Sequence, residues 1–225
     1  MIVIKEISKE FSQGKHRIRA LNNVTLSLHN EMTAIIGTSG AGKSTLLNIL
    51  AGVEPLDKGE IYIDNFAIHN SAENDLAKFR NANIGIVMQN YSLISDFSVL
   101  ENVYLPLSFS RQKHSKKDKR DKALEALKLV GIEYLADRDV NELSGGQMQR
   151  VAIARAVINS PRYILADEPT GALDGENTEK IIDLFKEINA KGVGIILVTH
   201  DMGVAHCCQR IVQLEDGKVV DDYTL

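Results

Sequence analysis

A glycine-rich loop constrains the fold of this chain more than any other stretch of its sequence. Residues 37–45 read GTSGAGKST and match the pattern G-x-x-x-x-G-K-[ST] at every fixed position. The apolar run 32–36 precedes the loop and predicts a buried strand, and apolar residues at helical spacing follow it as far as Gly52. Strand, glycine loop and helix in this order form a cradle for phosphate groups. The order favours a nucleoside triphosphate site over a chance glycine turn before a helix.

The chemistry of this loop indicates how it would hold its ligand. Glycines allow backbone N–H groups to turn inward, and the N-terminus of the following helix adds partial positive charge. Lys43 can reach the β- and γ-phosphates, and the Ser44 hydroxyl can ligate Mg²⁺. We therefore predict a nucleotide with Mg²⁺, bound by Gly37, Thr38, Ser39, Gly40, Ala41, Gly42, Lys43, Ser44 and Thr45.

Composition and charge limit the class of protein. The 225 residues are 44% hydrophobic, which supports a globular core, and the formal net charge of −4 gives no broad basic surface for nucleic acid. No apolar run approaches the roughly 20 residues that span a bilayer. Cys207 and Cys208 are the only cysteines, and neighbouring residues rarely meet disulfide geometry. Because the N-terminus also becomes charged too early for a secretory signal, we expect a reduced, cytosolic compartment.

Two strands are predicted before the phosphate loop. Residues 1–7 are β-branched and apolar, and residues 24–28 alternate between apolar and polar side chains. Together they predict a small antiparallel sheet laid against the nucleotide core. Phe11 lies where an aromatic ring could stack on an adenine. From spacing alone, an ordinary core phenylalanine is the favoured interpretation.

Polar residues stand at the ends of three later apolar runs that predict core strands. These residues are Gln89, the pair Asp167-Glu168, and His200. In open α/β sheets, ligands bind outside the carboxyl ends of the strands. Beside a phosphate loop, Asp167 would orient the Mg²⁺ shell and Glu168 could polarise the attacking water. Without further context, Gln89 could equally be a strand-end residue in solvent.

The pentapeptide LSGGQ, residues 143–147, begins another predicted helix, which ends at Ser160-Pro161. A Ser-Gly-Gly start exposes backbone N–H groups and a hydroxyl, and this suits a second anion-binding point. Taken alone, the pentapeptide could also be a glycine-rich helix cap.

Two further segments carry helix signals without an obvious ligand. Residues 98–101 have the spacing of a capping box, so a helix is predicted to begin near Val99. Residues 111–122 are rich in lysine and arginine but also contain acidic side chains. This mixture favours a solvated loop and helix start over a nucleic-acid or lipid patch.

The order of these motifs closely resembles that of the nucleotide-binding domain of ATP-binding-cassette (ABC) transporters. The phosphate loop, Gln89, LSGGQ, Asp167-Glu168, residues 172–174 and His200 stand in one order that covers essentially the whole chain. Residues 89–107 and 168–174 are similar to the lipoprotein-release and macrolide-exporter group. The resemblance implies an α/β fold: a P-loop NTPase core with an antiparallel β subdomain and a helical subdomain at roughly residues 87–160, in a single domain of residues 1–225.

The resemblance also implies roles that spacing cannot show. Phe11 would stack on the adenine of ATP, at a position that is more often tyrosine in the family. Gln89 would touch Mg²⁺ and the attacking water, and His200 would contact the γ-phosphate. Asp174 would lie at a dimer seam. The signature would bind ATP held by the other subunit, through Ser144, Gly145, Gly146 and Gln147.

The function implied is ATP hydrolysis coupled to a membrane partner. Two copies would close head to tail on two ATP molecules, at the cytoplasmic face of the membrane, and a separate transmembrane permease would export or extract a lipoprotein, peptide or drug. One alternative is the ATPase of a cell-division or peptide-sensing membrane complex. Another is a soluble ABC protein acting on DNA or ribosomes, but the tandem cassettes, coiled-coil insertions and zinc motifs usual there are missing from this sequence. A regulatory module without turnover is disfavoured by Glu168 and His200.

Two local expectations complete the sequence analysis. Asn30 occupies a turn position that is commonly glycine in the family, so we expect a strained turn or a left-handed asparagine. Residues 91–107 are expected to form the groove that receives a cytoplasmic helix of the permease. The alternative is that the apolar side chains of this segment fill the core of the helical subdomain: Leu93, Ile94, Phe97, Leu100 and Val103.

Overall fold

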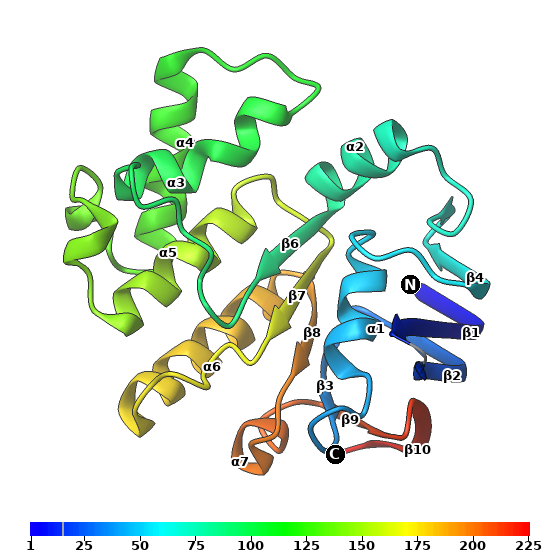
Figure 1. Cartoon of the computed structure of the whole chain (residues 1–225). Helices are drawn as coiled ribbons and strands as arrows, with labels where there is room; N and C mark the ends of the chain where they lie inside the picture. Colours follow the sequence, from blue (N-terminus) through cyan, green and yellow to red (C-terminus); the bar gives the residue numbers. More distant parts are fainter. Residues whose placement is uncertain (15) are drawn as a thin grey trace. The chain divides into compact units, whose positions relative to one another are not determined.

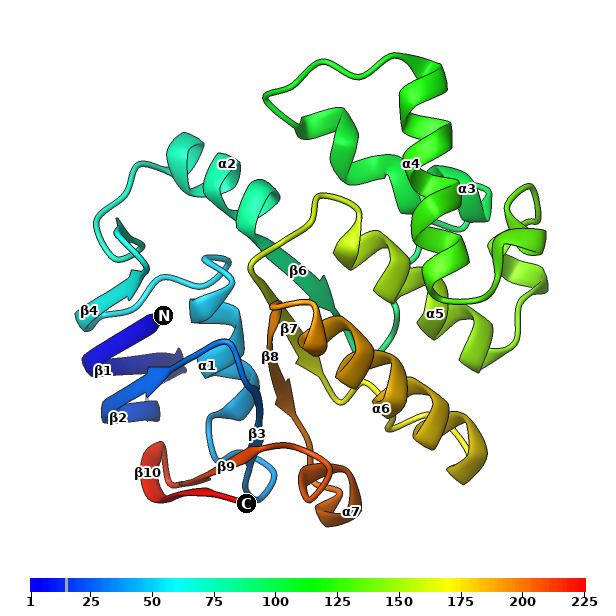
Figure 2. The same cartoon turned by 180° about the vertical axis from the view of Figure 1, so that it is seen from behind.

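The structure is a computed structural model that describes residues 1–14 and 16–225. The chain divides into two compact units. The terminal unit consists of Met1–Ala77 and Gly194–Leu225, and the middle unit consists of Lys78–Val193. In Figures 1 and 2 the terminal unit holds the blue, cyan, orange and red parts of the chain, and the middle unit runs from teal through green to yellow. The candidate site residues are shared between these two units.

The terminal unit contains the predicted antiparallel sheet. Its strands are β1 (Ile2–Gln13), β2 (His16–Leu28), β4 (Lys58–Ile63) and β5 (Phe66–Ala67), in the order β2-β1-β4-β5. The first strand is longer than its apolar N-terminal run, because its far half pairs with β2 as a hairpin. Side chains on one face, such as Ile2, Ile4 and Ile7, are fully buried.

The same unit contains a parallel set of strands beside the phosphate loop. In it β3 (Met32–Ile36) lies between β8 (Gly194–Val198) and β9 (Arg210–Glu215), parallel to both. Every residue of β3 and β8 is buried, as expected for continuous apolar runs in a parallel sheet. An Asp-Gly turn leads from β9 into its antiparallel partner β10 (Lys218–Thr224). The helices are α1 (Lys43–Leu50), α2 (Glu73–Asn83), which continues into the middle unit, and α7 (Met202–Ala205).

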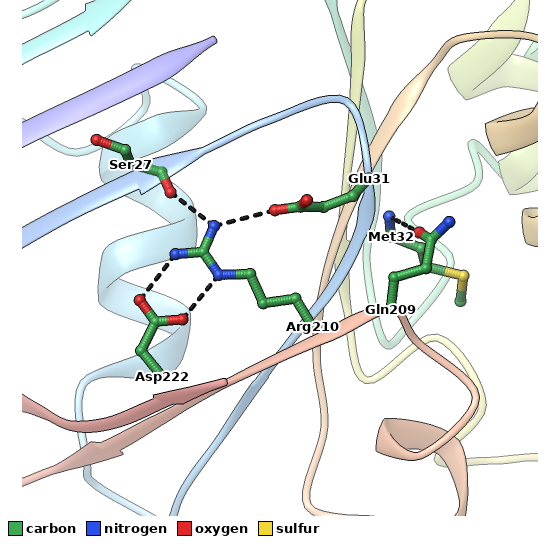
Figure 3. Close-up of polar contacts among 6 residues, drawn as sticks. All are labelled: Ser27, Glu31, Met32, Gln209, Arg210 and Asp222. Atoms are coloured by element: carbon green, nitrogen blue, oxygen red, sulfur yellow. Dashed lines mark hydrogen bonds and ion pairs between the residues drawn. The ribbon is translucent and has the colours of Figure 1, made fainter. Parts of the chain in front are cut away.

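Arg210 ties the last hairpin to the preceding strands (Figure 3). Its guanidinium donates two hydrogen bonds of 2.7 Å to the Asp222 carboxylate on β10. The remaining nitrogen donates to the Ser27 carbonyl at 2.8 Å and to Glu31 at 3.0 Å. The hydrogen bonds to Asp222 raise the pKa of Arg210, so this cation stays charged. One side chain thereby holds the ends of β2, β9 and β10 and the turn before β3.

The turn between β2 and β3 corrects the expectation for Asn30. The non-glycine residues with positive φ do not include Asn30, so it does not use the left-handed conformation. Contacts on either side hold the turn instead. The Gln209 side-chain oxygen accepts from the Met32 N–H at 2.5 Å, and the Glu31 carbonyl accepts from the Ile195 N–H at 3.0 Å (Figure 3 shows the first).

The middle unit combines a strand pair with a group of helices. Its strands β6 (Ile84–Val87) and β7 (Tyr163–Asp167) are parallel. Against β6 packs α5 (Gly145–Val157), so closely that a Cβ on Gly85 would lie 2.5 Å from the Ala156 carbonyl oxygen. The remaining helices of the unit are α3 (Val99–Tyr104), η1 (Leu105–Phe109), α4 (Lys116–Leu129), η2 (Glu133–Leu135), η3 (Val140–Glu142) and α6 (Gly175–Ala190).

Helix starts in the middle unit follow the capping rules that the sequence indicated. Ser98 and Glu101 form the predicted capping box at the start of α3. Ser115 and Asp118 form another at α4, which uses part of the charged segment as an exposed helix start. In the described part of the chain, no helix is both long and apolar enough to cross a membrane.

Candidate nucleotide site

The phosphate loop joins β3 to α1 and has the backbone geometry that phosphate binding requires. Gly42, with φ of 98°, immediately precedes α1 in the left-handed conformation. Because glycine has no side chain with which to cap the helix, an anion can take the place of a capping oxygen. Thr38, Ser39 and Gly40 are exposed around this helix start.

Two positions of the loop require glycine because there is no space for a Cβ atom. A Cβ on Gly37, which has φ of 152°, would lie 2.2 Å from the Leu214 carbonyl oxygen on β9. A Cβ on Gly42 would lie 2.2 Å from the Ala20 carbonyl oxygen on β2. By contrast, Gly40 has open space but φ of 84°, so it needs glycine for its conformation alone. The backbone of β9 therefore packs closely against one end of the loop and that of β2 against the other.

Lys43 places its ammonium at the centre of the loop. Its side chain is only 9% exposed, and Nζ donates to the carbonyls of Gly37 at 2.8 Å and Thr38 at 2.9 Å. Such a buried cation, held by carbonyls alone among the bonds described, can exchange them for phosphate oxygens of opposite charge. The next residue, Ser44, is exposed, as a hydroxyl must be to meet a metal ion.

Phe11 is not a core residue, so the interpretation that spacing favoured is wrong. Its side chain is 39% exposed near the end of β1. The Lys9 ammonium lies 5.2 Å from the centre of its ring. That ammonium is fixed by Glu54 at 2.5 Å and by the Pro55 carbonyl at 2.7 Å. The ring is thus available for stacking and is steadied by a cation–π contact, while its contact with adenine stays a prediction.

His200 lies at the same sheet edge as the phosphate loop. It follows β8, whose neighbour β3 ends where the loop begins. The intervening residue Thr199 is buried and donates its N–H to the Ile35 carbonyl at 3.2 Å. Asp201 then caps α7, with its carboxylate accepting from Gly203 at 2.7 Å. His200 is exposed between these two anchored neighbours.

The middle unit brings Gln89 and Glu168 together. Both residues follow parallel neighbouring strands, β6 and β7, whose carboxyl ends lie at one edge. A Cβ placed on Gly171 would lie 3.6 Å from the Glu168 Cβ and 3.7 Å from Gln89 Nε2. Asp167 ends β7 and is partly exposed. Glu168 has a positive φ of 45°, a backbone conformation that non-glycine residues adopt mainly where surrounding structure enforces it.

The LSGGQ pentapeptide forms a helix cap, which is one of the two interpretations that the sequence left open. Ser144 is the N-cap of α5 and forms a reciprocal capping box with Gln147. The Ser144 N–H donates to the Gln147 side chain at 2.9 Å, and the Gln147 N–H donates to the Ser144 hydroxyl at 3.4 Å. Anion binding at Gly145 and Gly146 stays a prediction.

Asp174 caps α6 beside this helix start. Its carboxylate accepts from the backbone N–H of Asn177 at 2.8 Å and from the Asn177 side chain at 3.0 Å, and these bonds lower the pKa of Asp174. A Cβ on Gly146 would lie 3.2 Å from the same Asn177 side chain. The two helix starts are therefore neighbours, and the predicted place of Asp174 at a dimer seam is untested.

The apolar residues of segment 91–107 divide into two groups, which corrects part of the groove expectation. Leu100 is 6% exposed and Val103 is fully buried, so these two belong to the core. Ile94 is 38% exposed, and Leu93 and Phe97 are half-buried. Of these five side chains, only Leu93, Ile94 and Phe97 are open to a contact with another protein.

The sequence analysis missed the residues that shape the loop between Gln89 and α3. Tyr91 and Ser92 have left-handed backbone conformations, and Arg155 from α5 binds the carbonyls of both. Asn102 is fully buried and binds the backbone of Ile94 through two hydrogen bonds, of 2.8 and 3.0 Å. No motif marks these contacts, because each joins residues that are separate in the sequence.

The two units together present the parts of a P-loop ATPase: a phosphate loop and a strand-end histidine in one, a carboxylate pair and a signature-like helix start in the other. A profile of the ABC transporter family matches residues 21–171. The chain is 46% identical to the ABC transporter ATP-binding protein MJ0796 of Methanocaldococcus jannaschii, over 97% of this chain and 95% of that protein. The chain belongs to the ABC transporter family.

Further relatives and solved structures agree with this assignment. The macrolide export ATP-binding/permease protein MacB of Escherichia coli is 40% identical over 99% of this chain, which spans only 34% of that protein. Among solved structures, the cassette MJ0796, described as a dimer in a post-hydrolysis state bound to ADP and Pi, has a TM-score of 0.94 at 44% identity. That alignment covers 100% of this chain and 99% of the other. The predicted family, the P-loop α/β fold and the ATPase class are confirmed.

Proposed function

We propose that this ABC-type ATPase powers a MacB-like membrane complex that exports or extracts a lipoprotein, peptide or drug through a separate permease. The observation that carries the catalytic part is the placement of Gln89 and Glu168 around Gly171, at the ends of β6 and β7. A carboxylate and an amide at this point can hold and deprotonate a water molecule.

The terminal unit would bind the nucleotide. Lys43 would exchange its two loop carbonyls for phosphate oxygens, and the loop N–H groups would bind the rest of the phosphate chain. Phe11 would hold the adenine by stacking. His200, at the same sheet edge, would contact the γ-phosphate.

The middle unit would carry out the chemistry. Glu168 would accept the proton of the attacking water, and Gln89 would orient that water. Ser44, Asp167 and Gln89 have the oxygen donors that Mg²⁺ prefers. When bound, Mg²⁺ would neutralise charge that builds on the β- and γ-phosphates. The left-handed backbone of Glu168 fits a residue whose position is enforced for function.

Two copies of the chain would form the complete enzyme. The head-to-tail arrangement would place Ser144, Gly145, Gly146 and Gln147 against ATP held by the other copy, with Asp174 at the seam. The exposed Ser144 and the neighbouring helix starts of α5 and α6 support a contact of this kind. The dimeric form of the related cassette MJ0796 also supports it.

A transmembrane permease would be the second partner, and the protein would then lie at the cytoplasmic face of the membrane. The relative MacB is an ATP-binding/permease protein, and this chain matches only a third of its length. The permease would contact Leu93, Ile94 and Phe97, three apolar residues of the segment that are not buried. No role in nucleic-acid binding is proposed.

The decisive experiment is purification from detergent-solubilised membranes with MgATP. Tagged Glu168→Gln protein should bring down a membrane-spanning permease, because ATP that is not hydrolysed holds the closed state. Lys43→Ala protein, which should not bind ATP, is the matched control for nonspecific capture. Recovery of Glu168→Gln protein with no membrane protein, or with ribosomes, would contradict the proposal.

A further inference from the structure

The turn that follows Gln89 has an unusual backbone. Tyr91 and Ser92 are consecutive non-glycine residues with φ of 60° and 46°. Side chains with a Cβ are disfavoured in this left-handed region, so such residues persist where other contacts enforce them. Local hydrogen bonds, from Tyr91 N–H to Met88 at 3.0 Å and from Ser92 N–H to Asn90 at 2.6 Å, close the turn.

Arg155 from α5 supplies the enforcing contact. Its Nη2 donates to the Tyr91 carbonyl at 2.7 Å and its Nη1 donates to the Ser92 carbonyl at 2.6 Å. The guanidinium therefore uses its planar fork on two successive carbonyls, which a lysine ammonium cannot match in geometry. Arg155 is half-buried, and burial lowers its pKa, but an arginine stays charged in proteins.

Tyr91 also reaches the start of the same helix. Its hydroxyl oxygen lies 3.1 Å from the point where a Cβ on Gly145 would sit. Gly145 is the first residue of α5 and the centre of the LSGGQ pentapeptide. The turn after Gln89 thus meets α5 at two places, the signature at its start and Arg155 near its end.

We propose that Arg155 is a positioning residue that fixes the Gln89 turn to the signature helix, so that Gln89 and the signature move as one body. The inference rests on the proposed function, in which the signature closes on ATP of the other subunit. A signature that docks on ATP would then set the position of Gln89 in its own subunit. Asn102 and Asn141 extend this body along the loop, since Asn141 Nδ2 also donates to the Ser95 carbonyl at 3.1 Å.

The test uses the full chain carrying Glu168→Gln, with Arg155→Lys added. ATP-dependent dimer formation is followed by size-exclusion chromatography with light scattering, and backbone motion is followed by hydrogen exchange. Loss of one charge-assisted hydrogen bond should raise the ATP concentration for half-maximal dimerisation about tenfold or more. Exchange should accelerate in residues 89–93 and 143–147 together, while MgATP binding to the monomer is unchanged.

Arg150→Lys is the matched control. Arg150 lies in the same helix and donates to a backbone carbonyl, that of Val130, at 2.6 Å, and none of the hydrogen bonds described for this chain joins it to the Gln89 turn. A general loss of helix stability would affect both variants equally. The proposal is overturned if Arg155→Lys and Arg150→Lys behave alike, or if exchange rises in only one of the two segments.

A second variant attacks the turn from the other side and leaves the helix intact. Ser92→Pro forces φ to about −65°, which is incompatible with the observed 46°. It should weaken dimerisation as Arg155→Lys does, and normal dimerisation of a folded Ser92→Pro protein would refute the proposal even if Arg155→Lys fails to fold. If Glu168→Gln protein itself does not dimerise with ATP, the proposed function fails, and that result is distinct from failure of this inference.

Discussion

The phosphate loop and the turn after Gln89 achieve left-handed backbone in opposite ways. The loop has glycine at its positive-φ positions, Gly37, Gly40 and Gly42. The Gln89 turn has Tyr91 and Ser92, which carry side chains, and is held by Arg155 from a helix more than sixty positions later. A glycine needs no outside help to adopt such a conformation, whereas a tyrosine or serine does. The backbone conformation of the phosphate loop therefore depends on its own residues, whereas that of the Gln89 turn depends on a residue distant in the sequence.

This difference suits the two jobs. A phosphate cradle must have the same shape whenever a nucleotide arrives, so a locally determined backbone is an advantage. A turn that carries Gln89, for which we propose a role in orienting water, is useful when its position responds to another part of the molecule. The two hydrogen bonds from Arg155 would supply such a dependence, because under our proposal a movement of α5 shifts the turn as well.

The largest effect is expected for a variant that should stop ATP hydrolysis, proposed for the middle unit, without weakening nucleotide binding, proposed for the terminal unit. Glu168→Gln keeps the size of the side chain but removes the proposed general base, so steady-state turnover should fall by on the order of 10²–10⁴-fold. MgATP affinity, measured by fluorescence titration, should remain close to the wild-type value, because the phosphate loop is untouched. Turnover within about threefold of wild type would exclude Glu168 as the base.

A pair of glycine variants tests whether the loop is fixed by space or by conformation. Gly42→Ala places a Cβ 2.2 Å from the Ala20 carbonyl oxygen, so the loop must move and MgATP affinity should fall about tenfold or more. Gly40 has a similar positive φ, but a Cβ there would meet open space, so Gly40→Ala should lower the MgATP affinity less than Gly42→Ala does. Isothermal titration of both proteins gives the comparison. Equal losses of MgATP affinity would mean that the positive φ, and not the lack of space for a Cβ, makes glycine necessary at both positions.

A mixing experiment tests whether the two units act across a dimer. Ser144→Arg puts a bulky side chain at the start of α5 and should inactivate the protein, as should Lys43→Ala. Mixed dimers should regain part of the ATPase activity, since one interface carries both defects and the other is intact. Ser144→Ala is the control, because it removes the cap, at a cost of about 1 kcal/mol, without adding bulk. Confirmed mixed dimers without activity would argue against independent composite sites.

The smallest effect concerns the loop surface beyond the Gln89 turn. Phe97→Asp should weaken permease binding roughly tenfold, since a half-buried aromatic side chain contributes on the order of 1–2 kcal/mol to a contact. MgATP affinity should not change. Ser95→Asp adds the same charge to an exposed neighbour without removing an apolar group, and it should bind the permease nearly normally. If pull-down yields are equal for both variants, Phe97 is not part of the contact.

The sequence alone was sufficient to predict a structural feature where that feature depends on residues close together in the chain. The glycine pattern predicted the phosphate loop, the apolar runs predicted β3 and β8, and Ser98 with Glu101 predicted the cap of α3. Each of these depends on residues within a few positions of one another. Apolar runs likewise predicted that Gln89 and Glu168 follow core strands, where ligands bind in open α/β sheets. The pairing of β6 with β7 as parallel neighbours is known only from the structure.

Tertiary structure alone decided the features that depend on contacts between distant residues. Phe11 is exposed rather than buried, Leu100 and Val103 are buried rather than open to a partner, and Asn30 needs no left-handed turn because Gln209 and Ile195 hold its neighbours. The hydrogen bonds from Arg155 to the carbonyls of Tyr91 and Ser92 could not be predicted from any local sequence pattern. Conformations that glycine or a capping residue makes favourable can be read locally, whereas those stabilised by a remote donor emerge only once the chain has folded.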